Sequence, residues 1–203
     1  LVSRLGQSHP SVSVLPVVAD FMLPVVLPPL PPDARVLGFF PGSTIGNLEP
    51  DAAQAFMRRA ADTLRPGASF LLGTDLRKPT SVLLPAYDDA AGVTAAFNRN
   101  LLVRLNRETN ADFDHTAFAH RTVWNDADSR IEMHLVSLRR QIVHVGGVAI
   151  AFDEQETIHT ENSYKHTPER WISLVESVGW ILRRRWSDPH DQFALFLFDL
   201  PAL

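Results

Sequence analysis

The chain has 203 residues, 45% of them hydrophobic, so it can bury roughly two-thirds of its unfolded surface and is expected to be folded rather than a disordered tail. Its formal net charge is −4 and its basic residues are scattered apart from Arg183 to Arg185, so nucleic acid is not expected as a partner. It has no cysteine, which excludes disulfides, thiolate metal sites and a cysteine nucleophile, and a cytoplasmic location is expected.

The first part of the chain is apolar and rich in proline. Val12 to Asp20 is β-branched and apolar, which predicts a buried strand, and Pro24 to Pro32 predicts a linker because proline does not fit a helix interior. The apolar stretch Val12 to Leu30 contains Asp20 and internal prolines, so no membrane span is expected. The sequence begins at Leu1 without a signal-peptide pattern, and we expect it to be the remainder of a longer chain.

The next segments have the spacing of a parallel α/β sheet. Val36 to Phe40 and Ala68 to Leu72 are short apolar runs that predict strands. Pro50 to Leu64 predicts an amphipathic helix, because its apolar residues recur at helical spacing and Arg65-Pro66-Gly67 follows. Ligands of such sheets gather at the carboxyl ends of the strands. Three polar features fall at these ends: Asp20, the loop Pro41 to Asn47, and Asp75.

The middle of the chain has a different pattern. Pro85 to Arg107 predicts a long helix that Gly92 could break, and Ile131 to Phe152 predicts two antiparallel strands joined at Gly146-Gly147. We expect this block to be an insertion that binds substrate. After it, Thr167 to Val178 predicts a helix, with Thr167 as N-cap and Pro168 in its first turn. A closing β-hairpin is expected from the apolar runs Trp180 to Trp186 and Gln192 to Leu200.

Five motifs stand out in the sequence. They are FFPGSTIGN (39–47), LRPG (64–67), AYDDAAGVTAAFN (86–98), RIEMHL (130–135) and TENSYK (160–165). Together they resemble the histidine methyltransferases of the ergothioneine pathway, and the resemblance covers essentially the whole chain. It implies methylation of the α-amino group of L-histidine to trimethylhistidine (hercynine), with S-adenosyl-L-methionine as cofactor.

The resemblance also implies a fold, the Rossmann-like α/β fold of class I methyltransferases, with strand order 3-2-1-4-5-7-6. The glycine-rich loop after the first strand and the acid after the second are not in this sequence, so the sheet is expected to lack its first two strands. We expect residues 1–78 to form a partial sheet domain, 79–166 the substrate-binding insertion, and 167–203 the final helix and hairpin. Residues outside this chain, or a second protomer, would complete the sheet.

By similarity, two residues hold the amino-acid end of the substrate. Asn47 would lie close to the amine that is methylated, and Tyr87 would bind the carboxylate; both are our candidates for the catalytic positions. Gly42 would add a backbone contact, since glycine lets the backbone approach a ligand closely. Taken alone, the loop around Gly42 fits an ordinary strand-to-helix turn better, and the resemblance is what favours a site.

Glu161 and Ser163 are two residues apart in an extended stretch, so their side chains should share one face. An acid that accepts a ring N–H and a hydroxyl that meets the other nitrogen would recognise an imidazole. Alone, Glu161 fits a solvated strand acid. By similarity, Met133 would pack beside the ring, although a methionine in an alternating strand is more often plain core. Phe97 would line the pocket for the methylated nitrogen, and plain packing explains its position equally well.

Three residues match cofactor positions of the family. Asp20 and Phe21 resemble the acidic and aromatic pair that contacts adenine, and Thr44 would add a contact; an acid at a strand end also commonly caps a turn. The eight histidines have no metal-ligand spacing, so no metal is expected. Two other hypotheses stay open: a methyltransferase for another amino acid or an indole derivative, and a histidine-binding fragment that lacks the cofactor site.

Overall fold

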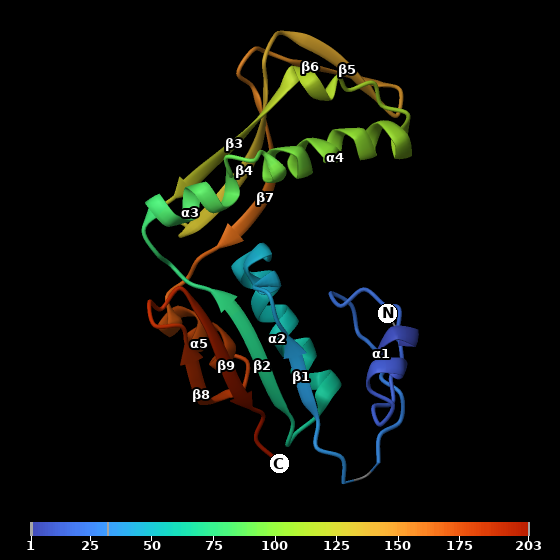
Figure 1. The fold of residues 1–203 in the computed structure, drawn as a ribbon, viewed down its shortest axis with the longest axis vertical. Helices are drawn as coiled ribbons and strands as arrows, with labels where there is room; N and C mark the ends of the chain where they lie inside the picture. Colours follow the sequence, from blue (N-terminus) through green and yellow to red (C-terminus); the bar gives the residue numbers. More distant parts are fainter. Residues whose placement is uncertain (1, 32, 203) are drawn as a thin grey trace.

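The computed structural model describes residues 2–31 and 33–202, which form two parts, one above the other in Figure 1. The lower part contains a four-stranded sheet, and the upper part contains a three-stranded sheet and a two-stranded hairpin. Two short segments connect them, one after β2 (Ser69–Asp75) and one after β7 (Thr157–Tyr164). Within the described residues, no helix is both long and apolar enough to cross a membrane.

The four-stranded sheet has the order β1-β2-β9-β8, with β1 at Leu37–Phe40, β9 at Phe193–Asp199 and β8 at Ile181–Ser187. β1 and β2 are parallel, whereas β9 is antiparallel to both of its neighbours. This is the 4-5-7-6 half of the order expected for class I methyltransferases. The structure therefore confirms the predicted fold class for this part of the sheet.

Two helices cover one face of this sheet, α2 (Pro50–Leu64) and α5 (Pro168–Glu176). Phe70 and Leu72 of β2 lie directly opposite Phe198 and Phe196 of β9, and both helices contribute to the same buried core. The structure confirms both predicted ends of α2 and the predicted start of α5, whereas α5 ends at Glu176, two residues before the predicted end at Val178. Pro50 begins α2, and the Thr167 hydroxyl caps α5 by accepting a hydrogen bond from the backbone N–H of Arg170.

The upper part lies between β2 and α5 in the chain. Its helices are α3 (Thr80–Tyr87) and α4 (Val93–Thr109), so the predicted long helix is interrupted at Gly92, which has a φ of 70°. Its three-stranded sheet has the order β3-β4-β7, with β3 at Phe118–Asn125 and β4 at Arg130–Ser137. β5 (Gln141–Val145) and β6 (Val148–Phe152) form the hairpin predicted at Gly146-Gly147. The prediction of two strands was incomplete, because β4 precedes this hairpin.

The prediction of a buried strand at residues 12–20 was wrong. This segment follows α1 (Val2–Ser8), has no strand conformation and is largely exposed beside α2 and β1 (Figure 1). A strand is stable when its backbone N–H and C=O groups pair with a neighbour. Among the described residues, β1 pairs with β2 alone, so the segment finds no neighbouring strand.

Candidate functional site

A pocket of about 360 Å³ lies where the two parts of the molecule meet, at the carboxyl ends of β1 and β2. Its lining comes from the loop after β1, the end of β2, the end of α3, the last part of β7 and the start of β9. The lining residues are Gly42, Ser43, Thr44, Asn47, Asp75, Tyr87, Glu161, Ser163, Lys165 and Phe193.

The loop after β1 is held in place by hydrogen bonds to β2. Gly42 and Ser43 both have positive φ, and the Ser43 hydroxyl accepts a hydrogen bond of 2.9 Å from the backbone N–H of Asp75. The short 3-10 helix η1 (Thr44–Asn47) follows. Gly46 lies so close to β7 that an added Cβ would be 3.0 Å from the Tyr164 carbonyl oxygen. These contacts orient Asn47 towards β7.

Asn47 contacts Glu161 directly. Its side-chain amide donates a hydrogen bond of 3.0 Å to Glu161 Oε1. Burial raises the pKa of Glu161, and the nearby Lys165 acts in the opposite direction. This amide fixes one carboxylate oxygen, and the other oxygen is available to a ligand.

The second cluster in the pocket joins Tyr87, Ser163 and Lys165. The hydroxyls of Tyr87 and Ser163 are 2.9 Å apart, and Lys165 Nζ donates to both, at 2.6 Å and 2.8 Å. Lys165 also forms an ion pair with Asp75 at 3.0 Å, and its side chain is only 1% exposed. Lys78 forms a second ion pair with Asp75, at 2.6 Å. The pocket therefore contains a buried ammonium group that is hydrogen-bonded to two hydroxyls and paired with a carboxylate.

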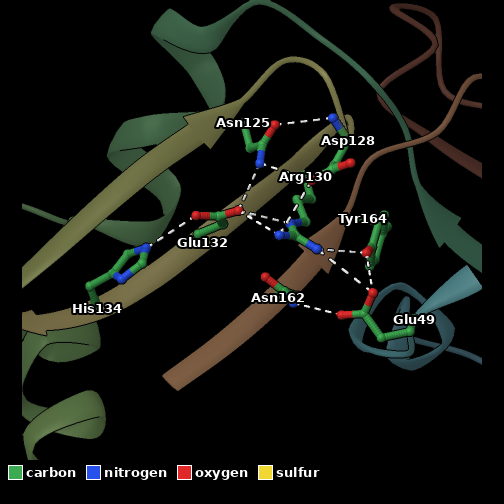
Figure 2. A network of polar contacts seen from close by, with 8 residues as sticks. All are labelled: Glu49, Asn125, Asp128, Arg130, Glu132, His134, Asn162 and Tyr164. Atoms are coloured by element: carbon green, nitrogen blue, oxygen red, sulfur yellow. Dashed lines mark hydrogen bonds and ion pairs between the residues drawn. The ribbon is translucent and has the colours of Figure 1, made fainter. Parts of the chain in front are cut away.

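On the other face of β7, a polar network connects the two parts of the molecule (Figure 2). Glu49, just before α2, accepts hydrogen bonds from Asn162 at 2.7 Å and from the Tyr164 hydroxyl at 2.5 Å. The hydrogen bond from Tyr164 is the main reason that the pKa of Glu49 is lowered. Arg130 donates to the same Tyr164 hydroxyl at 2.8 Å. Asn47 and Glu49 thus hold β7 from opposite faces.

The network continues along β4 to Glu132 and His134 (Figure 2). Burial acts to raise the pKa of Glu132, but hydrogen bonds from Asn125, Arg130 and His134 outweigh it and lower that pKa to about 2. Glu132, His134 and His159 have potential ligand atoms within 4.8 Å of one another. Because both carboxylate oxygens of Glu132 already accept hydrogen bonds within the network, we assign no metal to this cluster.

The structure brings together six of the ten residues expected at the site. All six line the same pocket: Gly42, Thr44, Asn47, Tyr87, Glu161 and Ser163. Met133 is buried directly opposite Glu161 in the β4–β7 register, so both side chains are on one face of the sheet. Phe97 is 67% exposed on α4 and does not line the pocket.

The two expected adenine contacts, Asp20 and Phe21, lie outside the pocket. Asp20 Oδ1 accepts a hydrogen bond of 2.8 Å from the backbone N–H of Met22, and Phe21 packs edge-on against Phe40 and Phe56. Sequence reasoning missed Lys165. Its position, two residues after Ser163, placed it on the same face as Glu161 and Ser163.

Comparison with known proteins places the chain in a family. Residues 1–200 match the family described as "Histidine-specific methyltransferase, SAM-dependent". The chain is 44% identical over 197 residues to a histidine N-alpha-methyltransferase of Mycolicibacterium smegmatis, covering 96% of this chain and 61% of that protein. It is 45% identical over 170 residues to the protein of that name from Mycobacterium tuberculosis, covering 83% and 53% respectively.

The chain therefore spans little more than half the length of these two relatives. A solved S-adenosylmethionine-dependent methyltransferase of Clostridium acetobutylicum also aligns with it, at a TM-score of 0.49 and 9% identity, covering 98% of this chain and 70% of that one. On the match across residues 1–200, the chain belongs to the SAM-dependent, histidine-specific methyltransferase family.

Proposed function

We propose that this chain forms the substrate-binding part of an enzyme that methylates the α-amino group of L-histidine, using S-adenosyl-L-methionine, to give trimethylhistidine in ergothioneine biosynthesis. One observation carries the proposal: Glu161 and Ser163 share a pocket with Asn47 and Tyr87. The pocket thus combines groups suited to an imidazole with groups suited to an amino-acid head. The cytoplasmic location expected from the sequence stays a prediction.

Each side chain then has a distinct task. Glu161 accepts a ring N–H through the carboxylate oxygen that Asn47 does not occupy, and Ser163 meets the other ring nitrogen. A side chain without this pattern would leave buried polar groups unpaired, which disfavours other amino acids. Met133, directly opposite Glu161, contributes apolar contact beside the ring. Gly42 would add a backbone contact at the head group.

At the head group, Tyr87 binds the carboxylate and Asn47 orients the lone pair of the amine. The cofactor supplies an activated methyl group when it is bound. Catalysis then depends on alignment and on exclusion of water around the amine rather than on a covalent intermediate. A strong base is unnecessary, because the amine can lose its proton to water before the reaction.

The described residues fit part of the cofactor. The Phe21 ring, supported by Phe40 and Phe56, offers a face for adenine, Asp20 could accept from its exocyclic amine, and Thr44 offers a hydroxyl. The sequence has no G-x-G pattern to hold the ribose and methionine end. We therefore propose that residues outside this chain, or a second protomer, complete the cofactor site and pair with β1, whose Leu37 and Phe39 are 56% and 63% exposed.

Isothermal titration calorimetry of the chain with L-histidine, L-tryptophan and S-adenosylhomocysteine tests the proposal. Binding of histidine in preference to tryptophan is expected, and Glu161→Ala should abolish that preference. Preference for tryptophan would favour the indole-derivative hypothesis. Binding of histidine without S-adenosylhomocysteine fits both the proposal, in which other residues complete the cofactor site, and the cofactor-deficient fragment. Lack of binding to any amino acid would refute the site.

A further inference from the structure

We infer that Lys165 is a positioning residue that makes the histidine site select the neutral imidazole over the imidazolium cation. The inference rests on the proposed function and deepens it, because it specifies the protonation state in which the substrate ring is bound. Lys165 would act through the pocket groups that it contacts, and not by touching the substrate.

The Lys165 ammonium group is surrounded by partners from the protein itself. An ammonium group has three N–H bonds, and Nζ has three partners at hydrogen-bonding distance: Asp75, Tyr87 and Ser163. Its side chain is buried, and Nζ also lies 4.9 Å from the centre of the Tyr87 ring. Lys165 is thus a fixed positive charge in the wall of the pocket.

The charges around the pocket are balanced before substrate enters. Asp75 from β2 and Glu161 from β7 are the nearby carboxylates, and Lys165 and Lys78 are the nearby cations. Tyr87, from α3, also faces the ammonium group. The His120 ring, from β3, is hydrogen-bonded to Asn98, to Thr122 and to the backbone carbonyl of Tyr87, and not to Lys165. A neutral ring keeps this balance, but an imidazolium would add an uncompensated cation next to Lys165.

The hydrogen-bonding pattern of the pocket also favours the neutral imidazole. Ser163 Oγ accepts from Lys165 at 2.8 Å, and its hydroxyl proton can be donated to Tyr87 or to the substrate ring. A ring nitrogen can accept that proton only if it has a lone pair. The neutral imidazole has one such nitrogen and one N–H for Glu161, whereas the imidazolium has two N–H groups and no acceptor.

The first test compares two ligands with the unmodified chain by calorimetry between pH 5.5 and pH 7.5. L-histidine should bind about tenfold more weakly at pH 5.5 than at pH 7.5, because its ring titrates near pH 6.5. 1,2,4-Triazole-3-alanine, whose ring stays neutral in this range, should bind with the same affinity at both values. Histidine binding that is unchanged or tighter at pH 5.5 would overturn the inference, and so would a parallel loss for the triazole, because a protein group would then be titrating.

The second test uses three variants of the lysines. Lys165→Met should reduce the tenfold pH dependence to about threefold or less, whereas Lys165→Arg should retain it. Lys78→Met is the matched control, since it removes the other ion pair of Asp75 without altering the pocket lining, and it should keep the dependence. An unchanged profile in Lys165→Met would overturn the role of Lys165. If that variant does not fold, the two-ligand comparison still decides whether the site selects the neutral ring, and loss of the pH dependence in Lys165→Arg would overturn the role of Lys165. Failure of the unmodified chain to bind either ligand at any pH would instead refute the proposed function.

Discussion

The hydrogen bond between Tyr164 and Glu49 connects the two parts of the molecule, and its contribution to stability can be measured. Tyr164→Phe removes the hydroxyl that donates to Glu49 and accepts from Arg130, but it keeps the ring that packs against His166. Arg130 retains Glu132 at 2.8 Å as a partner.

The contribution of the Tyr164–Glu49 hydrogen bond to the free energy of unfolding depends on how exposed the Glu49 side chain is. A hydrogen bond to a charged group contributes about 1.5–3 kcal/mol. The Glu49 side chain is 57% exposed and therefore partly screened, so we expect the pair to contribute about 1 kcal/mol. Loss of the Arg130 contact should bring the total cost of Tyr164→Phe to about 1–2 kcal/mol of unfolding free energy.

A double-mutant cycle isolates the pair. The free energies of unfolding of Tyr164→Phe, Glu49→Ala and the double variant are measured with urea, following tryptophan fluorescence, and a coupling energy of about 1 kcal/mol is expected at pH 7. Because the pKa of Glu49 is lowered in the folded state, its stabilisation is present above the unfolded value near 4.5 and is lost as the pH falls. The coupling should therefore shrink at pH 3.5. Additivity within about 0.3 kcal/mol at pH 7 would refute this account.

Three further predictions concern other parts of the molecule. Glu161→Gln should weaken histidine binding about tenfold or more, because a charge-assisted hydrogen bond becomes a neutral one; calorimetry that shows an equal loss for S-adenosylhomocysteine would remove Glu161 from substrate recognition. Gly38→Ala should cost about 1–3 kcal/mol, because its Cβ would lie 2.3 Å from the buried Phe70 ring, and an unchanged midpoint of thermal unfolding would contradict this. Glu132, with its pKa lowered from 4.5 to about 2, should stabilise the fold above pH 4.5 and lose this effect towards pH 2. Urea unfolding of Glu132→Gln should accordingly show a weaker loss of stability between pH 5 and pH 3, and an identical loss would argue against it.

Elements with local signals were predictable from the sequence. Pro50 and the Arg65-Pro66-Gly67 turn bound α2, and the Thr167-Pro168 pair starts α5, because caps and prolines act within one turn of their own position. The strand at residues 12–20 was not predictable in this way. Its apolar pattern describes a surface to be buried, whereas the strand also needs a neighbour, which no local pattern reports.

In the site, too, local sequence patterns predicted some features, and others depend on the fold. Alternation placed Glu161 and Ser163 on one face of β7, but the resemblance, not the pattern, suggested that Asn47 and Tyr87 would lie nearby. Lys165 escaped notice because a lysine near the end of a strand is ordinarily solvated. Only the fold reveals that Asp75, ninety residues earlier in the sequence, meets its ammonium group.

The placement of the lysines has a practical consequence at the bench. The sequence contains two lysines, Lys78 and Lys165, and both contact Asp75. Acylating dyes, amine-coupled sensor surfaces and lysine crosslinkers would therefore react at the edge of the pocket or find little lysine to modify. Immobilisation through an affinity tag, or labelling of a cysteine introduced on the exposed face of α4, would leave ligand binding undisturbed.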